Sequence, residues 1–402
     1  MLSRPVLFDG KLYNTSLNPP NNIEDFRAYI GAFIDREIAP HADQWTRERS
    51  VPKALHAAAG RAGLFGLKYS ARWGGLNRPY AFTHVMLDEF GRSGSMGCLL
   101  SLALQSEFST PHLALYGGEA LQRRFLAPAI AGTCILAIAM TEPQGGSDLA
   151  NLRTTATMVD GGYRVSGRKW MIGNASLADA FCVACRASDQ VEGQLPRITM
   201  LLVEATTPGF SVVRQLEKTG LHATPNCEIL FDDCLVPHEN VLGRPGLAIP
   251  QGLVANAYER VALAIIAMGA MREGWESAVR FLASRTAGKR ALLELSPWRH
   301  RLTQDYLLIE GVERIVKDAA ASLEGGRPDH AVVLMAKIAA TEACREVLER
   351  ASQAHGARGF LAEERIGRLY ADARALTIGG GATEALVEAL SRIVLPRVMP
   401  SR

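Results

Sequence analysis

Residues 140–148 form a loop whose side chains and backbone can hold a ligand. The loop follows an apolar run of strand character, residues 135–139, and contains two adjacent glycines, Gly145 and Gly146. Glycine readily adopts positive φ, so backbone N–H groups here can approach an anion closely. The hydroxyl groups of Thr141 and Ser147 lie on either side of the two glycines. Surface turns use the same residue types, so this loop alone leaves a simple turn as the alternative.

Cys182 and Cys185 have a spacing that is found in redox and zinc sites. They lie in a run of strand character, however, and neither a second cysteine pair nor a nearby histidine cluster accompanies them. Cysteine also packs as a small apolar residue. We therefore predict that both side chains belong to a core and that the chain binds no metal.

Composition excludes several classes of protein. The chain has 402 residues, 48% of them hydrophobic, which is enough to bury a large core. A total of 44 Lys and Arg against 41 Asp and Glu gives a net charge of +3, so nothing indicates nucleic acid or a membrane as a partner. Seven scattered cysteines do not suggest a disulfide framework. No apolar signal segment and no uninterrupted apolar run of membrane-spanning length is found, and we expect a cytoplasmic protein.

The elements that must position these residues fall into three parts, which predict an α+β fold. Helical periodicity predicts an N-terminal α-helical domain at residues 1–133. A period of two predicts a middle β-barrel-like domain at residues 134–246, with a hairpin turn at Asp160-Gly161-Gly162. Long apolar-faced helices predict a C-terminal four-helix bundle at residues 247–402. The predicted helices include residues 22–38, 52–62, 80–90, 98–104, 120–131, 252–283, 298–323, 331–355 and 383–395.

A series of motifs along nearly the whole chain resembles the acyl-CoA dehydrogenase family. The motifs stand in the family's order and are Glu37-Ile-Ala-Pro40, Gly63-Leu-Phe-Gly66, Trp73-Gly-Gly75, Thr141 to Asp148, Gly167 to Asn174, Phe231 to Pro237, Glu239 to Gly243, and Gln353 to Gly356 with Gly359-Phe360. The resemblance implies a non-covalent FAD between the β domain and the C-terminal bundle. It also implies a homodimer or homotetramer.

The resemblance assigns one group of FAD contacts to the 140–148 loop. Met140 and Thr141 would meet the isoalloxazine ring through backbone and hydroxyl groups. Gly146 and Ser147 would approach the flavin and the bound thioester, so Ser147 is also a substrate-binding candidate.

Two further candidate FAD contacts depart from the family's usual residues. Met171 and Gly173 stand where many relatives have Trp and Thr. The Gly173 N–H can still donate to the flavin edge, and the Met171 sulfur can pack on the ring. We therefore expect FAD to bind with an altered redox potential.

The remaining FAD candidates lie in the C-terminal part. Gln353 and Gly356 would contact the ADP half of FAD across a dimer. Relatives usually have Arg-x-x-Phe-Gly and then Gln near residues 284–301, but the Phe and the Gln are missing here. Arg285 is the candidate pyrophosphate ligand that remains, with a surface position as the alternative.

The resemblance also indicates the catalytic base. Many members carry a Glu in a loop at the position of Gly380, which has no side chain. A second branch, resembling the isovaleryl and long-chain enzymes, places the base on a long helix immediately before an Arg, as in Glu259-Arg260 here. We predict that Glu259 removes the α-proton, that the Gly380 N–H stabilises the thioester oxygen, and that Arg260 and Gly380 help to bind substrate. A surface ion pair is the alternative for Glu259 and Arg260.

The predicted function is FAD-dependent desaturation of an acyl thioester at its α,β bond. The substrate would be an acyl-CoA, or an acyl or aminoacyl group on a carrier protein. Ala257 slightly favours the carrier-protein variant, because several relatives have at this position a polar residue that helps to hold CoA. Electrons would pass to an electron-transferring flavoprotein or to oxygen. A flavin monooxygenase on the same scaffold and an inactive, flavin-free subunit are the alternatives. The presence of Glu259 argues against the monooxygenase, whose relatives lack this base.

Overall fold

The computed structural model describes residues 6–8, 11–13, 19–188 and 197–398. The chain divides into two compact units. Unit 1 comprises Met1–Pro79, Cys98–Lys218 and His222–Glu259, and unit 2 comprises Tyr80–Gly97, Thr219–Leu221 and Arg260–Arg402. The predicted domain boundaries at residues 133/134 and 246/247 stay predictions.

The helices of unit 1 begin with α1, Ile23–Glu37. The Asn22 side chain caps it by accepting hydrogen bonds from the Glu24 and Asp25 backbone N–H groups. Its buried face carries aromatic and aliphatic residues at helical spacing, as the sequence predicts. The other helices assigned mainly to unit 1 are α2 (Ala42–Glu48), α3 (Lys53–Arg61), α5 (Met96–Ala103), α6 (Thr110–Tyr116), α7 (Glu119–Leu121) and α8 (Ala127–Ile130).

Between α5 and α6 the helix widens into a π-helical stretch, η3, Leu104–Ser109. A second such stretch, η4 (Gln122–Leu126), joins α7 to α8. In η3 the buried Gln105 amide donates to the carbonyls of Ala129 and Cys134 and accepts from the Leu136 N–H. These bonds fix η3 against the first strand of the sheet. Stretches of π-helix occur often at functional sites because they redirect side chains.

The sheet of unit 1 has eight strands in the order β10-β7-β6-β4-β5-β9-β8, with β3 paired to β6. Strands β3 and β4 run parallel to β6, and the other pairs are antiparallel. The strands are β3 (Leu136–Ala139), β4 (Thr155–Val159), β5 (Gly162–Gly173), β6 (Ala180–Ala187), β7 (Ile198–Glu204), β8 (Phe210–Gln215), β9 (Asn226–Pro237) and β10 (Val241–Leu242). The predicted hairpin turn is confirmed, because Val159 pairs with Gly162 where β4 turns into β5.

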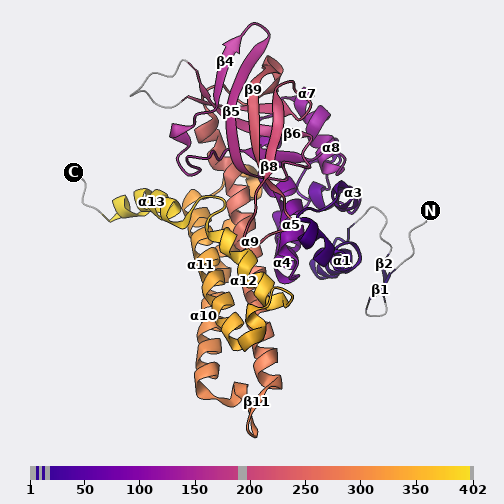
Figure 1. Ribbon diagram of the computed structural model, residues 1–402, viewed down its shortest axis with the longest axis vertical. Coiled ribbons are helices and arrows are strands. Elements are labelled where there is room, and N and C mark those ends of the chain that lie inside the picture. Colours follow the sequence, from indigo (N-terminus) through magenta and orange to yellow (C-terminus); the bar gives the residue numbers. More distant parts are fainter. Residues whose placement is uncertain (1–5, 9–10, 14–18, 189–196, 399–402) are drawn as a thin grey trace. The chain divides into compact units, whose positions relative to one another are not determined.

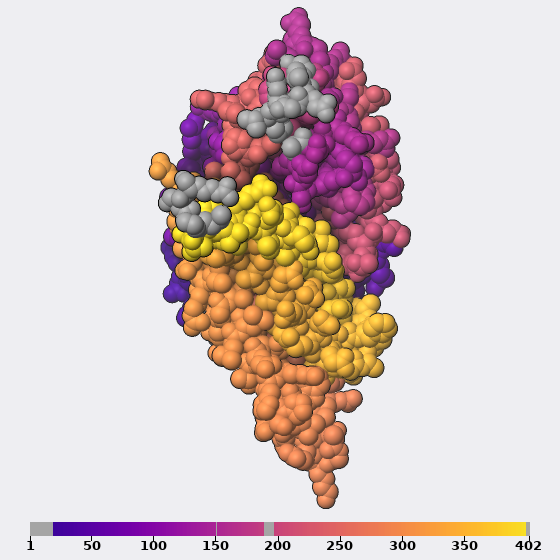
Figure 2. Space-filling view, turned by 90° about the vertical axis from the view of Figure 1, so that its left-hand side faces the viewer, coloured from indigo at the N-terminus to yellow at the C-terminus, as the bar shows by residue number. Residues whose placement is uncertain are grey.

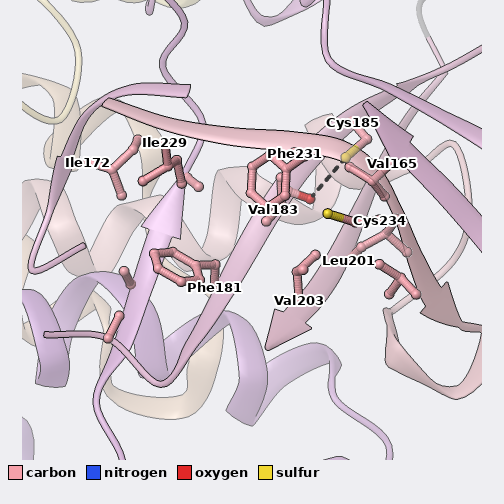
Figure 3. Close-up of a cluster of buried hydrophobic side chains, with 14 of the residues drawn as sticks. Val165, Ile172, Phe181, Val183, Cys185, Leu201, Val203, Ile229, Phe231 and Cys234 are labelled. Carbon is pink, nitrogen blue, oxygen red and sulfur yellow. Dashed lines mark hydrogen bonds between the residues drawn. The ribbon is translucent and has the colours of Figure 1, made fainter. Parts of the chain in front are cut away.

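One face of this sheet surrounds an apolar core (Figure 3). Phe181 and Val183 of β6, Leu201 of β7 and Phe231 of β9 are all buried in it. Side chains from distant strands meet because the sheet curves around them. Cys182 and Cys185 are fully buried, which confirms the predicted core packing. Among the described residues, no group of three or more His, Cys, Asp or Glu side chains could hold a metal ion.

Unit 2 is built mainly from long helices (Figure 1). They are α4 (Tyr80–Arg92), the part of α9 (Ala248–Ser284) from Arg260 onward, α10 (Ser296–Ser322), α11 (His330–Ala354), α12 (Arg365–Ala373) and α13 (Thr383–Val394). Gly91 of α4 and Gly269 of α9 allow these two helices to touch. A Cβ atom on Gly91 would lie 2.1 Å from the Ile266 carbonyl oxygen, and one on Gly269 would lie 2.2 Å from that of Asp88.

Helix α9 bears on the expectation that the chain has no apolar run long enough to span a membrane. By length and composition it could cross a bilayer, and it is the one such helix within the described residues. Most of its apolar stretch is buried in the protein, as in the core helix of a globular fold.

The segment in which the family motif is missing folds as a small hairpin. Strands β11 (Thr286–Ala287) and β12 (Arg290–Ala291) pair across a turn at Gly288, whose φ is +63°. The hairpin projects from the end of the unit 2 helices (Figures 1 and 2). Two further short strands near the N-terminus, β1 (Val6–Phe8) and β2 (Lys11–Tyr13), also pair with each other.

Candidate functional site

The 140–148 loop is a tight turn with an open outer side. Glu142 and Gly145 exchange two backbone hydrogen bonds of 3.0 Å, which closes a two-residue turn. Gly145, Gly146 and Ser147 are exposed, and a Cβ on Gly145 would meet nothing within 4 Å. A Cβ on Gly146 would lie 3.1 Å from the Thr141 hydroxyl oxygen. The predicted flavin-side residues are therefore grouped on one accessible face, next to the half-buried Met140 and Thr141.

A buried ion pair holds the base of this loop, and the sequence analysis did not identify it. The Lys169 ammonium donates to Glu142 Oε1 at 2.8 Å, and the two side chains are 0% and 1% exposed. Glu142 also accepts from the backbone N–H groups of Arg153, at 2.6 Å, and Thr154, at 2.9 Å. Burial alone would raise the pKa of Glu142, but the Lys169 charge and these hydrogen bonds outweigh it and lower the pKa to about 2. The loop is thereby fixed to β5.

One signal in the sequence could have indicated this pair. Lys169 has the same inward direction on β5 as the buried Tyr163 and Val165, since side chains alternate along a strand. A lysine at an inward position requires a buried partner of opposite charge. The pattern does not reveal which acid supplies it, because Glu142 lies 27 residues earlier.

Met171 projects from an irregularity near the end of β5. The β5–β9 register shifts between Lys169 and Ile172, and Met171 has φ of +59°. Its carbonyl accepts from the Asn226 amide at 3.0 Å, while its side chain remains 39% exposed. Such bulges re-aim side chains and are common near active sites. The preceding residue, Trp170, donates its backbone N–H to the Thr141 carbonyl at 2.8 Å, which joins this bulge to the loop.

Gly173 ends β5 against the π-helical stretch. A Cβ at this position would lie 2.5 Å from Leu104 Cδ1, so any larger residue here would require the Leu104 side chain to move. The next residue, Asn174, is fully buried; its amide donates to the Ser101 carbonyl at 2.8 Å and accepts from the Ser101 hydroxyl at 2.6 Å. The end of β5 is thus fixed against α5 and η3.

These residues of unit 1 fit the flavin end of FAD. The loop presents small, exposed residues with hydroxyl and backbone donors, and Met171 adds an exposed apolar surface beside it. No side chain of Gly145 or Gly146 obstructs the approach of a planar ring. Here the flavin would supply the acceptor for a hydride.

Glu259 lies on α9 and is half-buried. The residues that follow Arg260, residues 261–266, are buried, so the base candidate stands at the start of an apolar stretch as predicted. The ring of its neighbour Tyr258 lies 5.6 Å from the Lys68 ammonium. The prediction that burial raises the pKa of Glu259 stays a prediction.

In unit 2, Arg260 and Gly380 are brought together. Arg260 Nε donates to the Gly380 carbonyl at 3.2 Å, and the buried Lys337 ammonium donates to the Gly381 carbonyl at 2.7 Å. Two cations therefore fix consecutive carbonyls of this loop. Gly380 and Gly381 have φ of +69° and +105°, so a larger residue at either position would be strained.

The other FAD candidates of unit 2 are exposed. Gln353 lies in the last turn of α11, and Gly356 follows with φ of +58° and open space around its Cβ position. Arg285 stacks over the Phe281 ring, with its guanidinium carbon 5.5 Å from the ring centre. Arg285 is exposed, which is compatible with both the ligand role and the surface alternative.

Comparison with known sequences adds an independent result. The family described as acyl-CoA dehydrogenase matches in three parts: its N-terminal domain at residues 20–133, its middle domain at residues 137–234 and its C-terminal domain at residues 253–395. Benzylmalonyl-CoA dehydrogenase of Aromatoleum aromaticum is 34% identical over 355 residues, 88% of this chain and 93% of that protein. The mitochondrial isovaleryl-CoA dehydrogenase of Oryza sativa is 30% identical over 364 residues, 90% of this chain and 88% of that protein.

Solved structures agree. The crystal structure of acyl-CoA dehydrogenase from Geobacillus kaustophilus superposes with a TM-score of 0.89 at 31% identity, covering 94% of this chain and 100% of that chain. The chain therefore belongs to the acyl-CoA dehydrogenase family. It is an FAD-dependent oxidoreductase that acts on the CH–CH group of an acyl-CoA, and the predicted α+β fold with its three family domains is confirmed.

Proposed function

We propose that Glu259 is the base that removes the α-proton during desaturation of an acyl-CoA. The supporting observation is that Gly380 has no side chain, while Glu259 stands half-buried on α9 before a buried apolar stretch. A carboxylate in such surroundings is partly desolvated, which makes it a stronger base toward a weakly acidic C–H group. Relatives named isovaleryl-CoA and long-chain acyl-CoA dehydrogenases are consistent with this branch of the family.

Gly380 contributes its backbone N–H in this proposal. A donor aimed at the thioester oxygen stabilises the negative charge that develops as the α-proton leaves, and losing one such donor typically costs about 3 kcal/mol of barrier. Arg260 and Lys337 support this role, because they hold the Gly380 and Gly381 carbonyls and so restrict the loop backbone. FAD, when bound, supplies the hydride acceptor.

The Glu259→Gln variant tests the proposal. The amide keeps the size of the side chain and removes the base, so flavin reduction by the preferred acyl-CoA should slow by about 10²- to 10⁴-fold while FAD content stays normal. Anaerobic stopped-flow absorbance measures this rate. Glu384→Gln is the matched control, because Glu384 is an exposed carboxylate at the start of α13 and should have no effect. If Glu259→Gln reduces its flavin at the wild-type rate, Glu259 is not the base and the surface ion pair with Arg260 is the better account.

The electron acceptor is part of the same proposal. An electron-transferring flavoprotein is the expected partner, with oxygen as the alternative. Reduced enzyme mixed with such a flavoprotein, and separately with air, distinguishes them by which one restores flavin absorbance. The relatives above are named for CoA thioesters, which does not favour the carrier-protein alternative. One is named for benzylmalonyl-CoA, a thioester of a dicarboxylic acid.

A further inference from the structure

Unit 1 contains a second buried ion pair, which the proposed chemistry does not use. The Lys68 ammonium donates to Glu107 and, at 2.7 Å, to the Ser106 carbonyl. It also lies 4.9 Å from the centre of the Tyr69 ring and 5.6 Å from that of Tyr258. An ammonium between two aromatic faces gains cation–π attraction.

The pair lies close to residues that carry the proposed base and a predicted flavin contact. Tyr258 directly precedes Glu259, the proposed base, on α9. On the other side, Glu107 lies one helical turn after Leu104, whose side chain reaches the position of Gly173, a predicted flavin contact. The acyl group that undergoes desaturation must lie between the catalytic base and the flavin. The Lys68 and Glu107 pair therefore adjoins both elements that enclose the acyl group.

The two charges differ in accessibility. Glu107 is 1% exposed, whereas the Lys68 side chain keeps 12% exposure, so Lys68 is the less buried member of the pair. The Glu107 and Ser106 bonds use two of the three ammonium protons. The third proton has no hydrogen-bond acceptor among these contacts, and the Tyr69 and Tyr258 rings lie next to the nitrogen. A buried ion pair contributes little net stability compared with apolar packing. Stability therefore does not explain why Lys68 and Glu107 are buried here, and a role in binding does.

We propose that Lys68 selects acyl-CoA substrates whose acyl group carries a carboxylate. The ammonium binds the carboxylate through its third proton, Glu107 holds the ammonium in place, and the rings of Tyr69 and Tyr258 exclude water from it. This inference rests on the proposed function for the location of the acyl group. It concerns which acyl group the site binds. The chemical step is the same for all of them.

The experiment compares paired substrates. Succinyl-, glutaryl- and adipyl-CoA, together with benzylmalonyl-CoA, are each set against an apolar isostere in which an isopropyl group replaces the carboxylate. Two readouts are taken on holoenzyme: kcat/KM for flavin reduction, and equilibrium binding to the Glu259→Gln variant from the shift of the flavin spectrum. A hydrogen bond between two charged groups predicts a preference of about 10- to 100-fold for at least one carboxylate over its isostere.

Variants assign that preference to Lys68. Lys68→Met keeps length and removes the charge, and Lys68→Met/Glu107→Gln avoids a stranded buried carboxylate if the single variant does not fold. Both should lower the preference to near unity while the apolar isosteres bind as before. Lys68→Arg should retain part of it. Lys317→Met, which removes an exposed lysine paired with Glu313, is the control and should change nothing.

The outcomes separate cleanly. A wild-type protein without preference in either readout overturns the proposal, and so does a preference that survives in the double variant. A more stable double variant with unchanged selectivity would identify the pair as purely structural. If no acyl-CoA reduces the flavin, the role of Glu259 fails, but the binding ratio still decides the role of Lys68.

Discussion

Glu142 is the residue on which the geometry of the flavin-side loop depends. Replacing it with Gln leaves the Lys169 charge buried without a counter-charge, which typically costs about 3 to 5 kcal/mol in the free energy of unfolding. Urea denaturation of the FAD-loaded protein measures this loss, and FAD affinity should fall with it. Glu388→Gln is the matched control. It breaks an exposed pair with Arg392 on α13 and should cost less than about 1 kcal/mol.

The same carboxylate predicts a pH dependence. Its pKa is about 2 in the folded protein, below the ordinary value of 4.5, so the unfolded chain takes up the proton more readily. The stability that Glu142 contributes is therefore complete above pH 4.5 and is lost as pH falls toward 2. The difference in unfolding free energy between wild type and Glu142→Gln should shrink over this range. A difference that stays constant with pH would contradict the ionised pair.

At this scale the sequence predicted individual positions better than partnerships. The exposed loop at residues 140–148 was located from its glycines and hydroxyls, because local backbone preferences act within a few residues. The partners of Lys68 and Lys169 were not predicted, since the acids that neutralise them lie 39 and 27 residues away in the chain. Hydrophobic periodicity carries no information on such pairing.

The junction between β5 and η3 is an element whose packing can be tested. Gly173→Thr would place a Cβ 2.5 Å from Leu104 Cδ1 and should destabilise the protein by about 1 to 3 kcal/mol through overpacking. Adding Leu104→Ala should restore part of this loss, and urea denaturation of both variants measures it. Gly31→Ala is the control, since nothing lies within 4 Å of its Cβ position. Equal costs with and without Leu104→Ala would show that this contact does not explain the glycine.

Elements were predicted well where periodicity is long. Helix α11, His330–Ala354, differs by one residue at each end from the predicted helix at 331–355. The hairpin of β11 and β12 and the π-helical η3 were not predicted, because each depends on one or two residues that alter a local backbone path. The irregularity at Met171 was missed for the same reason.

The whole molecule is expected to assemble with copies of itself, as a homodimer or homotetramer. Unit 2 exposes large apolar side chains, with Phe360 94% exposed beside the Gln353 and Gly356 segment. Helices α12 and α13 also lie on its surface (Figure 2), and Val387 of α13 is exposed. A phenylalanine exposed to this extent in the segment that is predicted to bind FAD across a dimer supports an interface there. Light scattering of the yellow, FAD-loaded protein should therefore give a mass above that of one chain.

Phe360→Asp should lower that mass toward one chain and weaken FAD binding at the same time, if Gln353 and Gly356 serve a neighbouring copy. Met158→Asp, which changes an exposed apolar residue of β4, should leave the mass unchanged. A wild-type protein that is monomeric with FAD bound would refute the assembly. The expected cytoplasmic location stays a prediction, to be checked by cell fractionation.

The seven cysteines are all buried and none forms a disulfide, which limits their reaction with oxidants and alkylating reagents. A thiol reacts as its thiolate, and burial raises the pKa of Cys134, Cys182, Cys185 and Cys344 to about 12. In the folded state these sulfurs are both unreachable and unreactive. Covalent labelling of these four cysteines is thereby limited to moments when the surrounding structure opens, so the rate of modification at each of them measures how often that part of the protein unfolds locally.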